Sequence, residues 1–314
     1  MPSRVAKGRA YKDTTYQQLR SFYETARLGS LSAAAASLGM SQPTVSQQVH
    51  ALERQVGDRL IEPFGRGSRL TEAGRLLAEL IGPAVQSIAS LKQAYQAARG
   101  QLRPRLIVAA SPRVITEDLP ECLRQFTQRY PRVHLTVREY RRDQIPAAVE
   151  AGEVELGFTG THSTHDSDPW AYSLWLECEP WYELETILVT PRNHPLARKR
   201  SVHPRDLVGY PLVNGPAGVP DQFAQAILDK YGMFREQSSC IETTLAAAIY
   251  RYVEMGFGIG LTGRPPGRPV PADVHVRDMS RHFGRQIVYL VRRRHAPLSE
   301  AALAFARTVK ALLT

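Results

Sequence analysis

Between Ser41 and Arg54 the sequence SQPTVSQQVHALER concentrates neutral side chains that form hydrogen bonds. Amide, hydroxyl and imidazole groups all occur within this short stretch. An amide side chain can pair with two atoms of an adenine edge in the major groove of DNA, and hydroxyls bind bases or phosphates. The chemistry that this segment favours is therefore hydrogen bonding to DNA.

The elements around this segment predict how it is held. A first helix, ending at Gly29, is indicated by the helical spacing of Leu19, Phe22, Tyr23 and Ala26. A second helix, between Ser30 as its N-cap and Gly39, has an inward face of Leu31, Ala34, Ala35 and Leu38. Ser41 can cap a third helix, and Pro43 fits in its first turn. Two helices joined by a short turn that contains glycine are typical of a helix-turn-helix, and the alanines allow a close approach.

On a helical wheel the third helix separates into two faces. The inward face would be Val45, Val49, Leu52 and Val56. The opposite face would be Pro43, Gln47, His50 and Arg54, flanked by Thr44 and Ser46. This second face would contact DNA, although a solvated helix face explains the same pattern equally well from this helix alone.

The following segment, GDRLIEPFGRGSRLTEAG, favours the DNA interpretation. Its glycines predict a sharply turned hairpin with Arg66 and Arg69 at the tip, where arginines suit phosphates or a minor groove. A helix-turn-helix followed by a basic hairpin is the order of elements in a winged helix-turn-helix domain.

The run YQQLRSFYETARLGSLSAAAASLGMSQPTVSQQVHALERQVGDRL, followed by RLTEAG, resembles the N-terminal domain of the LysR-type transcriptional regulators. With the wheel, this resemblance gives the candidate DNA-binding residues Ser32, Gln42, Pro43, Thr44, Ser46, Gln47, His50, Arg54, Arg66 and Arg69. Ile61 and Pro63 replace an aromatic residue and an arginine that the family usually has. Gln47 stands where an arginine is common, so the resemblance implies a different operator sequence.

Residues 72–100 are predicted to form a linker helix. Apolar residues at alternating steps of four and three form a heptad seam, which implies a second helix packed against Leu77, Ile81, Ala84, Ile88, Leu91, Tyr95 and Ala98. The alternative is a helix packed on its own chain. A seam between domains favours self-association as a dimer, which suits inverted half-sites on DNA; family members commonly pair further into tetramers.

Charge and composition narrow the class of protein. The formal net charge is +10, and the first 100 residues hold 13 Lys/Arg against 7 Asp/Glu, which favours a polyanionic partner there. Residues 1–13 are predicted to be a disordered basic tail and not a signal peptide, and no apolar run is long enough for a membrane span. We expect a cytoplasmic, nucleoid-associated protein. Cys122, Cys178 and Cys240 indicate neither a disulfide framework nor a zinc motif, and no cofactor or metal is expected.

From residue 101 the pattern changes to alternating strands and helices, which predicts an α/β class with parallel strands. Strands are expected over 106–110, 134–140, 156–160, 186–191, 211–215, 258–263, 274–279 and 287–293. The domains would be a winged helix-turn-helix over 14–71, the linker helix, and an effector-binding domain over 101–314. Ligands of α/β sheets bind beyond the carboxyl ends of strands.

The segments FTQRYPRVHLTV, HPLA, GYPLV and YVEMGFGIGL resemble the LysR-type effector domain, which has two lobes like a periplasmic binding protein. The resemblance implies lobe I at about 104–180 and 269–314, and lobe II at about 181–268. It is greatest to the branch that controls cysteine biosynthesis and sulfur assimilation, whose cavity takes small anions. Candidate effector-binding residues are Ser111, Arg113, Thr159, Thr161, Trp181, Asn214, Thr243 and Thr244.

A guanidinium matches the geometry of a carboxylate or sulfate, so Arg113 favours an anionic effector. The alternative explanation of an arginine at this position is an ion pair on the protein surface. GFGIGLTG ends a helix and enters a strand, the reverse of a phosphate-binding loop, and indicates close helix–strand packing. The sequence lacks GxSxG, HExxH and Walker motifs. We expect a regulator that is not an enzyme; the alternatives are a ligand-independent DNA-binding regulator and a metabolite-binding enzyme.

Overall fold

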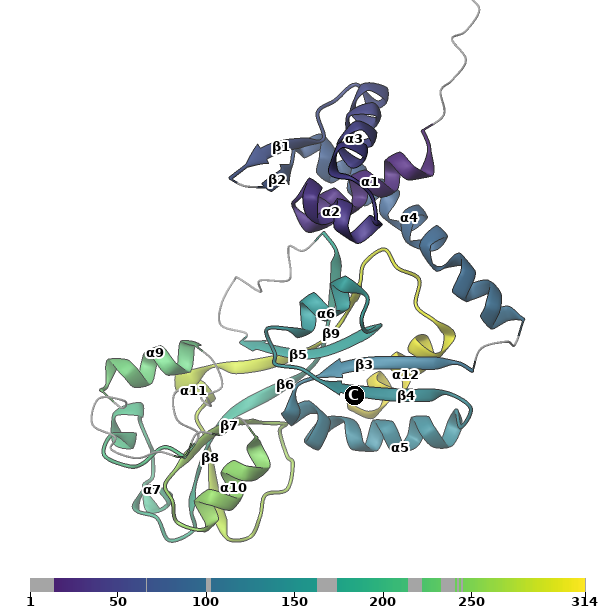
Figure 1. Cartoon of the computed structure of the whole chain (residues 1–314). Helices are drawn as coiled ribbons and strands as arrows, with labels where there is room; N and C mark the ends of the chain where they lie inside the picture. Colours follow the sequence, from purple (N-terminus) through teal and green to yellow (C-terminus); the bar gives the residue numbers. More distant parts are fainter. Residues whose placement is uncertain are drawn as a thin grey trace, which may run out of the picture. The chain divides into compact units, whose positions relative to one another are not determined.

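The computed structural model describes residues 14–65, 67–99, 103–162, 174–213, 222–232, 241, 243 and 245–313 (Figure 1). Two compact units divide the chain. The N-terminal unit is Met1–Leu102 with Arg294–Pro297, and the C-terminal unit is Arg103–Arg293 with Leu298–Thr314. Of the described helices, none has the length and apolarity that crossing a membrane requires.

Three helices of the N-terminal unit begin and end where local signals predict. They are α1 (Tyr16–Leu28), α2 (Leu31–Leu38) and α3 (Gln42–Val56). The Ser30 and Ser41 side chains accept hydrogen bonds from the first turns of α2 and α3, and so satisfy N–H groups that a helix leaves unpaired. Gly29 and Gly39 adopt the left-handed conformation (φ 62° and 66°) that ends the preceding helix. The predicted helix-turn-helix is confirmed.

The inner faces of these helices share one core. Its buried members are Phe22, Tyr23, Ala34, Ala35, Val45, Val49 and Leu52. The small side chains of α2 permit close packing, as the sequence predicted. The prediction that Val56 belongs to this face is wrong, because Val56 is the last residue of α3 and is 43% exposed where the chain turns at Gly57.

A buried carboxylate joins α3 to the hairpin formed by β1 (Ile61–Phe64) and β2 (Gly67–Leu70). Glu53 accepts hydrogen bonds from the backbone N–H groups of Leu60 (2.9 Å) and Ile61 (3.4 Å). Burial on its own raises the pKa of Glu53, but hydrogen bonds from His50 and these amides outweigh it, so the pKa lies below its ordinary value. The charged form of Glu53 therefore holds the recognition helix and hairpin together.

The linker helix α4 spans Glu72–Ala98. Its first turn begins against the hairpin, because a Cβ at Gly74 would lie 2.0 Å from the carbonyl oxygen of Leu60. Several large apolar side chains of α4 are 48–68% exposed: Leu76, Leu80, Ile88, Leu91 and Tyr95. We call these side chains the exposed apolar stripe of α4. In the first half of the helix, the stripe residues Leu76 and Leu80 lie one position before the predicted seam residues Leu77 and Ile81, which are half-buried.

One seven-stranded sheet runs through the C-terminal unit in the order β4-β3-β5-β9-β6-β7, with β8 also paired to β6. The strands are β3 (Arg105–Ala110), β4 (His134–Glu139), β5 (Leu156–His162), β6 (Leu176–Pro191), β7 (Gly260–Arg264), β8 (Val274–Asp278) and β9 (Arg285–Arg293). Among these described strands only the pairs β3–β4 and β3–β5 are parallel, and the remaining pairs are antiparallel. The expectation of parallel strands therefore holds for the first three strands of the sheet.

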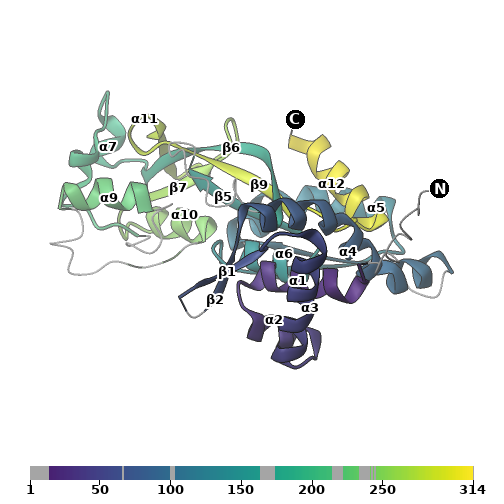
Figure 2. The same ribbon diagram turned by 90° about the horizontal axis from the view of Figure 1, so that it is seen from above.

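The long strand β6 connects two lobes. Its first half pairs with β9, and its second half pairs with β7 and β8 (Figures 1 and 2). Because β8 pairs with the same half of β6 as β7 does, Val274–Asp278 belongs to the second lobe. The pairing places the return to the first lobe near Gly284, later than the residue 269 expected from the sequence. Of the strand expected over 211–215, the described part forms only a single bridge between Leu212 and Ile259.

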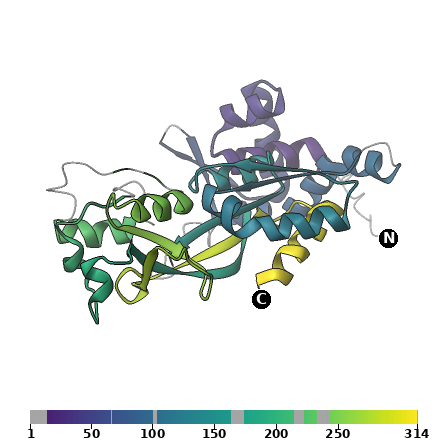
Figure 3. The ribbon, with the colours of Figure 1, turned by 90° about the horizontal axis from the view of Figure 1, so that it is seen from below.

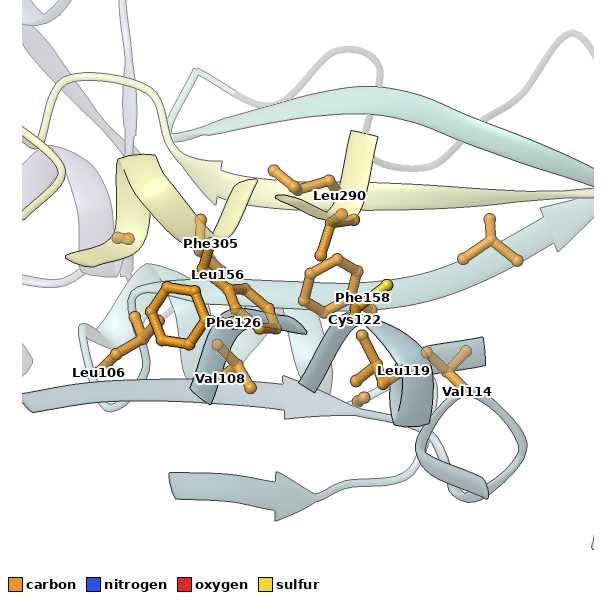
Figure 4. Packing of buried hydrophobic residues seen from close by; sticks show 14 of the residues in the cluster. Leu106, Val108, Val114, Leu119, Cys122, Phe126, Leu156, Phe158, Leu290 and Phe305 are labelled. Atoms are coloured by element: carbon orange, nitrogen blue, oxygen red, sulfur yellow. The ribbon is translucent and has the colours of Figure 1, made fainter. Parts of the chain in front are cut away.

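Helices cover both faces of each lobe. In the first lobe, α5 (Leu119–Arg129) and α12 (Glu300–Leu313) bury one face of the sheet around Phe126, Phe158 and Phe305 (Figure 4), and α6 (Ile145–Ala151) covers the other. In the second lobe (Figure 3), α10 (Ala246–Glu254) packs on one face. The opposite face is covered by α7 (Pro195–Arg198), the 3-10 helix η2 (Pro204–Leu207), α9 (Gln222–Lys230) and α11 (Ser280–Phe283).

Glu53→Ala is expected to destabilise the N-terminal unit by about 3 kcal/mol, since two buried N–H groups lose their acceptor. Hydrogen exchange of amides within residues 42–70 of the full chain measures this. The exposed Glu62→Ala serves as the control and should cost less than about 1 kcal/mol. Because the pKa of Glu53 is lowered in the fold, its contribution is present at neutral pH and is lost as the pH falls through that lowered value. Equal exchange in both variants would refute this role.

Candidate DNA-reading surface and effector site

One face of α3 is polar and open to solvent. Its exposed residues are Gln42, Pro43, Thr44, Gln47, His50 and Arg54, and Ser46 is half-buried. All were candidates from the sequence, and all lie on one helix whose opposite face is fixed in the core. The helix therefore presents amide, hydroxyl and basic groups on a rigid support.

Hydrogen bonds orient the first turn of α3. The hydroxyl of Ser32, in α2, donates to Oε1 of Gln42 (3.0 Å), and the hydroxyls of Ser41 and Thr44 lie 2.8 Å apart. Nδ1 of His50 faces Glu53 (2.8 Å). These contacts restrict the rotamers of the candidate residues before any partner arrives, which lowers the entropic cost of binding. Gln48 instead accepts a hydrogen bond from Ser21 of α1, so its amide is engaged within the domain.

The hairpin carries Arg69, whose positive charge is partly balanced by a neighbouring carboxylate. Arg69 pairs with Glu62 (2.6 Å) and lies over the ring of Phe64 (5.1 Å to the centroid). Both members of the ion pair are about half exposed, and such pairs are worth at most about 1 kcal/mol. A phosphate can therefore replace Glu62 at little cost. Arg66 lies outside the described residues.

In the C-terminal unit, Ser111 and Arg113 follow the carboxyl end of β3, as predicted. A π-helical turn, η1 (Val114–Asp118), comes next and continues into α5. Ser111 is half-buried, and its carbonyl accepts a hydrogen bond from the N–H of Ile115 (3.0 Å). Arg113 therefore lies beyond the carboxyl end of a parallel strand, the edge at which α/β sheets commonly bind ligands.

Arg113 is held by groups that the sequence did not reveal. Its Nη2 lies 2.8 Å from Oδ2 of Asp118 and 3.0 Å from the hydroxyl of Tyr182, which in turn donates to Asp118. Nη1 of Arg113 is buried and has no hydrogen-bond partner among the described residues. Arg113 is thus neither a free cation nor a surface ion pair, because its side chain is only 13% exposed.

Asp118 also contacts the second lobe. Nη1 of Arg268, in the segment after β7, lies 3.2 Å from Oδ1 of Asp118, and its Nη2 donates to the carbonyl of Glu117. We name Arg113, Glu117, Asp118, Tyr182 and Arg268 the inter-lobe ion cluster. Of these residues only Arg113 was a candidate. Asp118 was not expected beside it, because a period of 3.6 residues does not bring Arg113 and Asp118 together.

The electrostatics of the inter-lobe ion cluster favour a charged Arg113. Burial on its own lowers the pKa of Arg113, but Tyr182, Asp118 and Glu117 outweigh it, so the pKa is raised. Burial raises the pKa of Glu117. Burial likewise raises the pKa of Tyr182 well above its ordinary value, so its hydroxyl keeps the proton that it donates to Asp118.

Two predicted effector residues are engaged elsewhere. Thr159 is completely buried, and its hydroxyl donates to the carbonyl of Arg142 (3.2 Å), so it presents no group to a ligand. The indole of Trp181 donates to the carbonyl of Val309 in α12 (3.1 Å) and packs on Phe158, within the core of the first lobe. A β-bulge at Trp181 causes this, because it breaks the alternation of side chains along β6.

The remaining predicted effector residues are described in part or not at all. The hydroxyl of Thr243 accepts a hydrogen bond from the N–H of Leu245 (3.2 Å) just before α10. Thr161 lies in β5, but its side chain is outside the described part of the chain, as are Asn214 and Thr244.

A winged helix-turn-helix with a polar recognition helix, joined by a long helix to a two-lobed α/β unit, is the architecture of a DNA-binding transcriptional regulator with an effector-binding domain. Residues 16–75 match the family model "Bacterial regulatory helix-turn-helix protein, lysR family", and residues 99–314 match "LysR substrate binding domain". The chain belongs to the LysR family of DNA-binding transcriptional regulators, which carry an effector-binding domain.

Curated relatives agree with this assignment. The regulator SsuR of Burkholderia cenocepacia is 29% identical over 255 residues, which is 78% of each chain. CysB of the same organism is 28% identical over 74% of this chain and 72% of the relative. Both are named as helix-turn-helix-type transcriptional regulators. A probable hydrogen peroxide-inducible genes activator of Mycobacterium avium is 30% identical over 83% of this chain and 82% of the relative.

Solved structures show the same fold. A full-length OxyR variant from Pseudomonas aeruginosa superposes with a TM-score of 0.51 at 19% identity, covering 95% of this chain and 98% of that one. Full-length BenM gives 0.50 at 18% identity, with 95% and 96% coverage. At this identity the likeness concerns the fold alone.

Gln47→Ala is expected to weaken binding to a selected operator by about 1–3 kcal/mol and to relax the preference at one base pair. Fluorescence anisotropy with the operator and its single-base variants measures both effects. Gln128→Ala, an exposed change on α5, is the control and should leave affinity unchanged. If Gln47→Ala kept the affinity and base preference of the wild type, Gln47 would not contact a base.

Proposed function

We propose that this regulator binds double-stranded DNA as a dimer or tetramer through the exposed face of α3, and that a small anion bound between the two lobes sets its activity. The observation that carries this proposal is the buried guanidinium of Arg113 at the end of β3, with one nitrogen free of hydrogen-bond partners in the described part of the chain. It acts in the cytoplasm at the nucleoid and performs no catalysis.

In the DNA complex, Gln42 and Gln47 bond base edges, while the hydroxyls of Thr44 and Ser46 bond bases or phosphates. Ser32 contributes by orienting Gln42. Further contacts come from Pro43, His50 and Arg54, and Arg66 and Arg69 of the hairpin bind phosphates. Support comes from the exposure of these α3 residues and from the rotamer-restricting hydrogen bonds at the start of α3.

In the effector site, Arg113 binds the anion, and Ser111, Thr161, Asn214, Thr243 and Thr244 supply polar contacts around it. The resemblance of the sequence to the branch that controls cysteine biosynthesis and sulfur assimilation makes a sulfur-containing oxyanion the first ligand to test. Such a ligand shifts the balance between two arrangements of the lobes, and it must bind them with different affinity to do so. A ligand-independent regulator would leave the two-lobed unit without a purpose.

Self-association uses the exposed apolar stripe of α4. A stripe of large apolar side chains exposed along a long helix marks a site of helix–helix association. A second copy of α4 is the proposed partner, because a dimer with two-fold symmetry brings the same surface of both subunits together.

Leu91→Glu is expected to weaken the dimer at least about tenfold, since a buried charge replaces an apolar contact. Sedimentation equilibrium of the full chain measures the change. Leu303→Glu changes an exposed leucine of α12 in the same way and should leave the assembly intact. A Leu91→Glu protein that assembles as the wild type does would show that this part of α4 is not the interface.

Arg113→Gln is expected to lower the affinity for sulfate or a short carboxylate at least about tenfold, because a charge-assisted hydrogen bond is lost. Calorimetric titration of a panel of such anions into the full chain measures this. Arg251→Gln removes an exposed arginine of α10 as the control. An anion that bound wild type and Arg113→Gln equally well would remove Arg113 from the site.

A further inference from the structure

Asp118 divides its two carboxylate oxygens between the two lobes. Oδ2 contacts Arg113 and Tyr182 of the first lobe, and Oδ1 contacts Arg268 of the second. The side chain is completely buried, whereas Arg268 is 35% exposed. One residue therefore joins the cation expected to bind the effector to the segment after β7.

The π-helical turn explains how Asp118 reaches Arg113. In η1 the N–H of Leu119 bonds the carbonyl of Val114, so residues five apart follow one another on the same side. Arg113 and Asp118 are five residues apart. On a regular α-helix the same spacing would direct the two side chains to different faces. The irregular turn thus serves this contact, in line with the frequent occurrence of π-turns at functional sites.

Asp118 gives Arg113 the kind of partner that an anionic ligand would supply. A carboxylate on a guanidinium has the charge and geometry of an incoming oxyanion. While Asp118 is in place, the attraction of Arg113 for a second anion is largely cancelled. Nη1, which no described residue contacts by a hydrogen bond, shows that the guanidinium still has a hydrogen bond to offer.

We infer that Asp118 determines the specificity of the effector site, as a resident carboxylate that a small oxyanion replaces on Arg113. This rests on the proposed function, because it assumes that Arg113 is the effector's partner. A ligand succeeds only if its oxygens hold Arg113 better than Asp118 does, so small oxyanions are accepted and neutral or cationic molecules are rejected. Since Asp118 also holds Arg268, its release from Arg113 changes the contact between the lobes.

Titration of inorganic sulfate into the full chain tests this inference. Asp118→Asn keeps the shape of the side chain but removes its charge, and should raise the affinity for sulfate about tenfold. Glu117→Gln removes a neighbouring carboxylate that, among the described contacts, makes no hydrogen bond to Arg113, and should raise the affinity by less than about threefold. Equal gains in both variants would show a general charge effect and overturn the inference, as would an Asp118→Asn protein that does not bind sulfate at about 10 mM.

A second variant covers the case in which Asp118→Asn fails to fold. Tyr182→Phe removes only the hydroxyl that donates to Asp118, so it loosens Asp118 and should tighten sulfate binding about threefold. Weaker or unchanged binding by Tyr182→Phe would contradict the inference. If Arg113→Gln loses sulfate binding while Asp118→Asn equals the wild type, the proposed effector site stands and only the role of Asp118 falls. If Arg113→Gln binds sulfate as the wild type does, the proposed site itself falls.

Hydrogen exchange tests the connection to the second lobe. In the wild type, sulfate is expected to slow the exchange of amides within Arg264–Arg268, because Asp118, once released from Arg113, holds Arg268 more firmly. In Asp118→Asn sulfate should have no such effect. Identical exchange in the wild type with and without bound sulfate would overturn this part of the inference.

Discussion

The C-terminal unit depends on the contacts that surround the completely buried carboxylate of Asp118. Burying an ion costs several kcal/mol unless partners surround it, and removing one partner of such a pair typically costs about 3–5 kcal/mol. Here the partners come from three places: Arg113 before η1, Tyr182 in β6 and Arg268 after β7. The requirement fixes the positions of these three elements. It also joins the segment after β3 in the first lobe to the segment after β7 in the second.

The N-terminal unit also depends on a buried carboxylate that joins separate elements. Glu53 is buried between α3 and the hairpin and satisfies the N–H groups of Leu60 and Ile61. Because Gly74 has no side chain, α4 can begin against the carbonyl of Leu60. The recognition helix, the hairpin and the linker helix therefore meet at one point, so that α4 and the DNA-reading face of α3 are rigidly related within this unit.

Local rules explain which features could be predicted. Serine caps, glycine ends and the 3.6-residue period act within a few residues, and they located α1, α2 and α3 correctly. The strands β3, β4, β5 and β9 were also predicted within two residues of their observed ends, whereas the first half of β6, Leu176–Glu185, was not predicted. Val56 was wrongly assigned to the core because a helical wheel gives a face to every residue of a helix, whereas the core does not extend to the last residue of α3.

Features that depend on distant residues could not be predicted. A π-turn changes the facing of Arg113 and Asp118, and a bulge redirects Trp181, but neither has a signature in the periodicity. Burial of Thr159 depends on the loop at Arg142, and the inter-lobe ion cluster requires Tyr182 and Arg268, which lie far along the chain. A charged residue at a strand end suggested a binding site, but the sequence did not reveal that its counter-ion was already present.

We propose that binding of an anion to Arg113 controls the binding of DNA by α3. The most direct measurement is the affinity of the full chain for an operator selected from random DNA, by anisotropy, as sulfate is added at constant ionic strength. The account predicts that sulfate changes the operator affinity of the wild type at least about fivefold, within the usual range of coupling energies, and has no effect on Arg113→Gln. The same sulfate dependence in both proteins, or none in the wild type at concentrations that saturate its site, would contradict it.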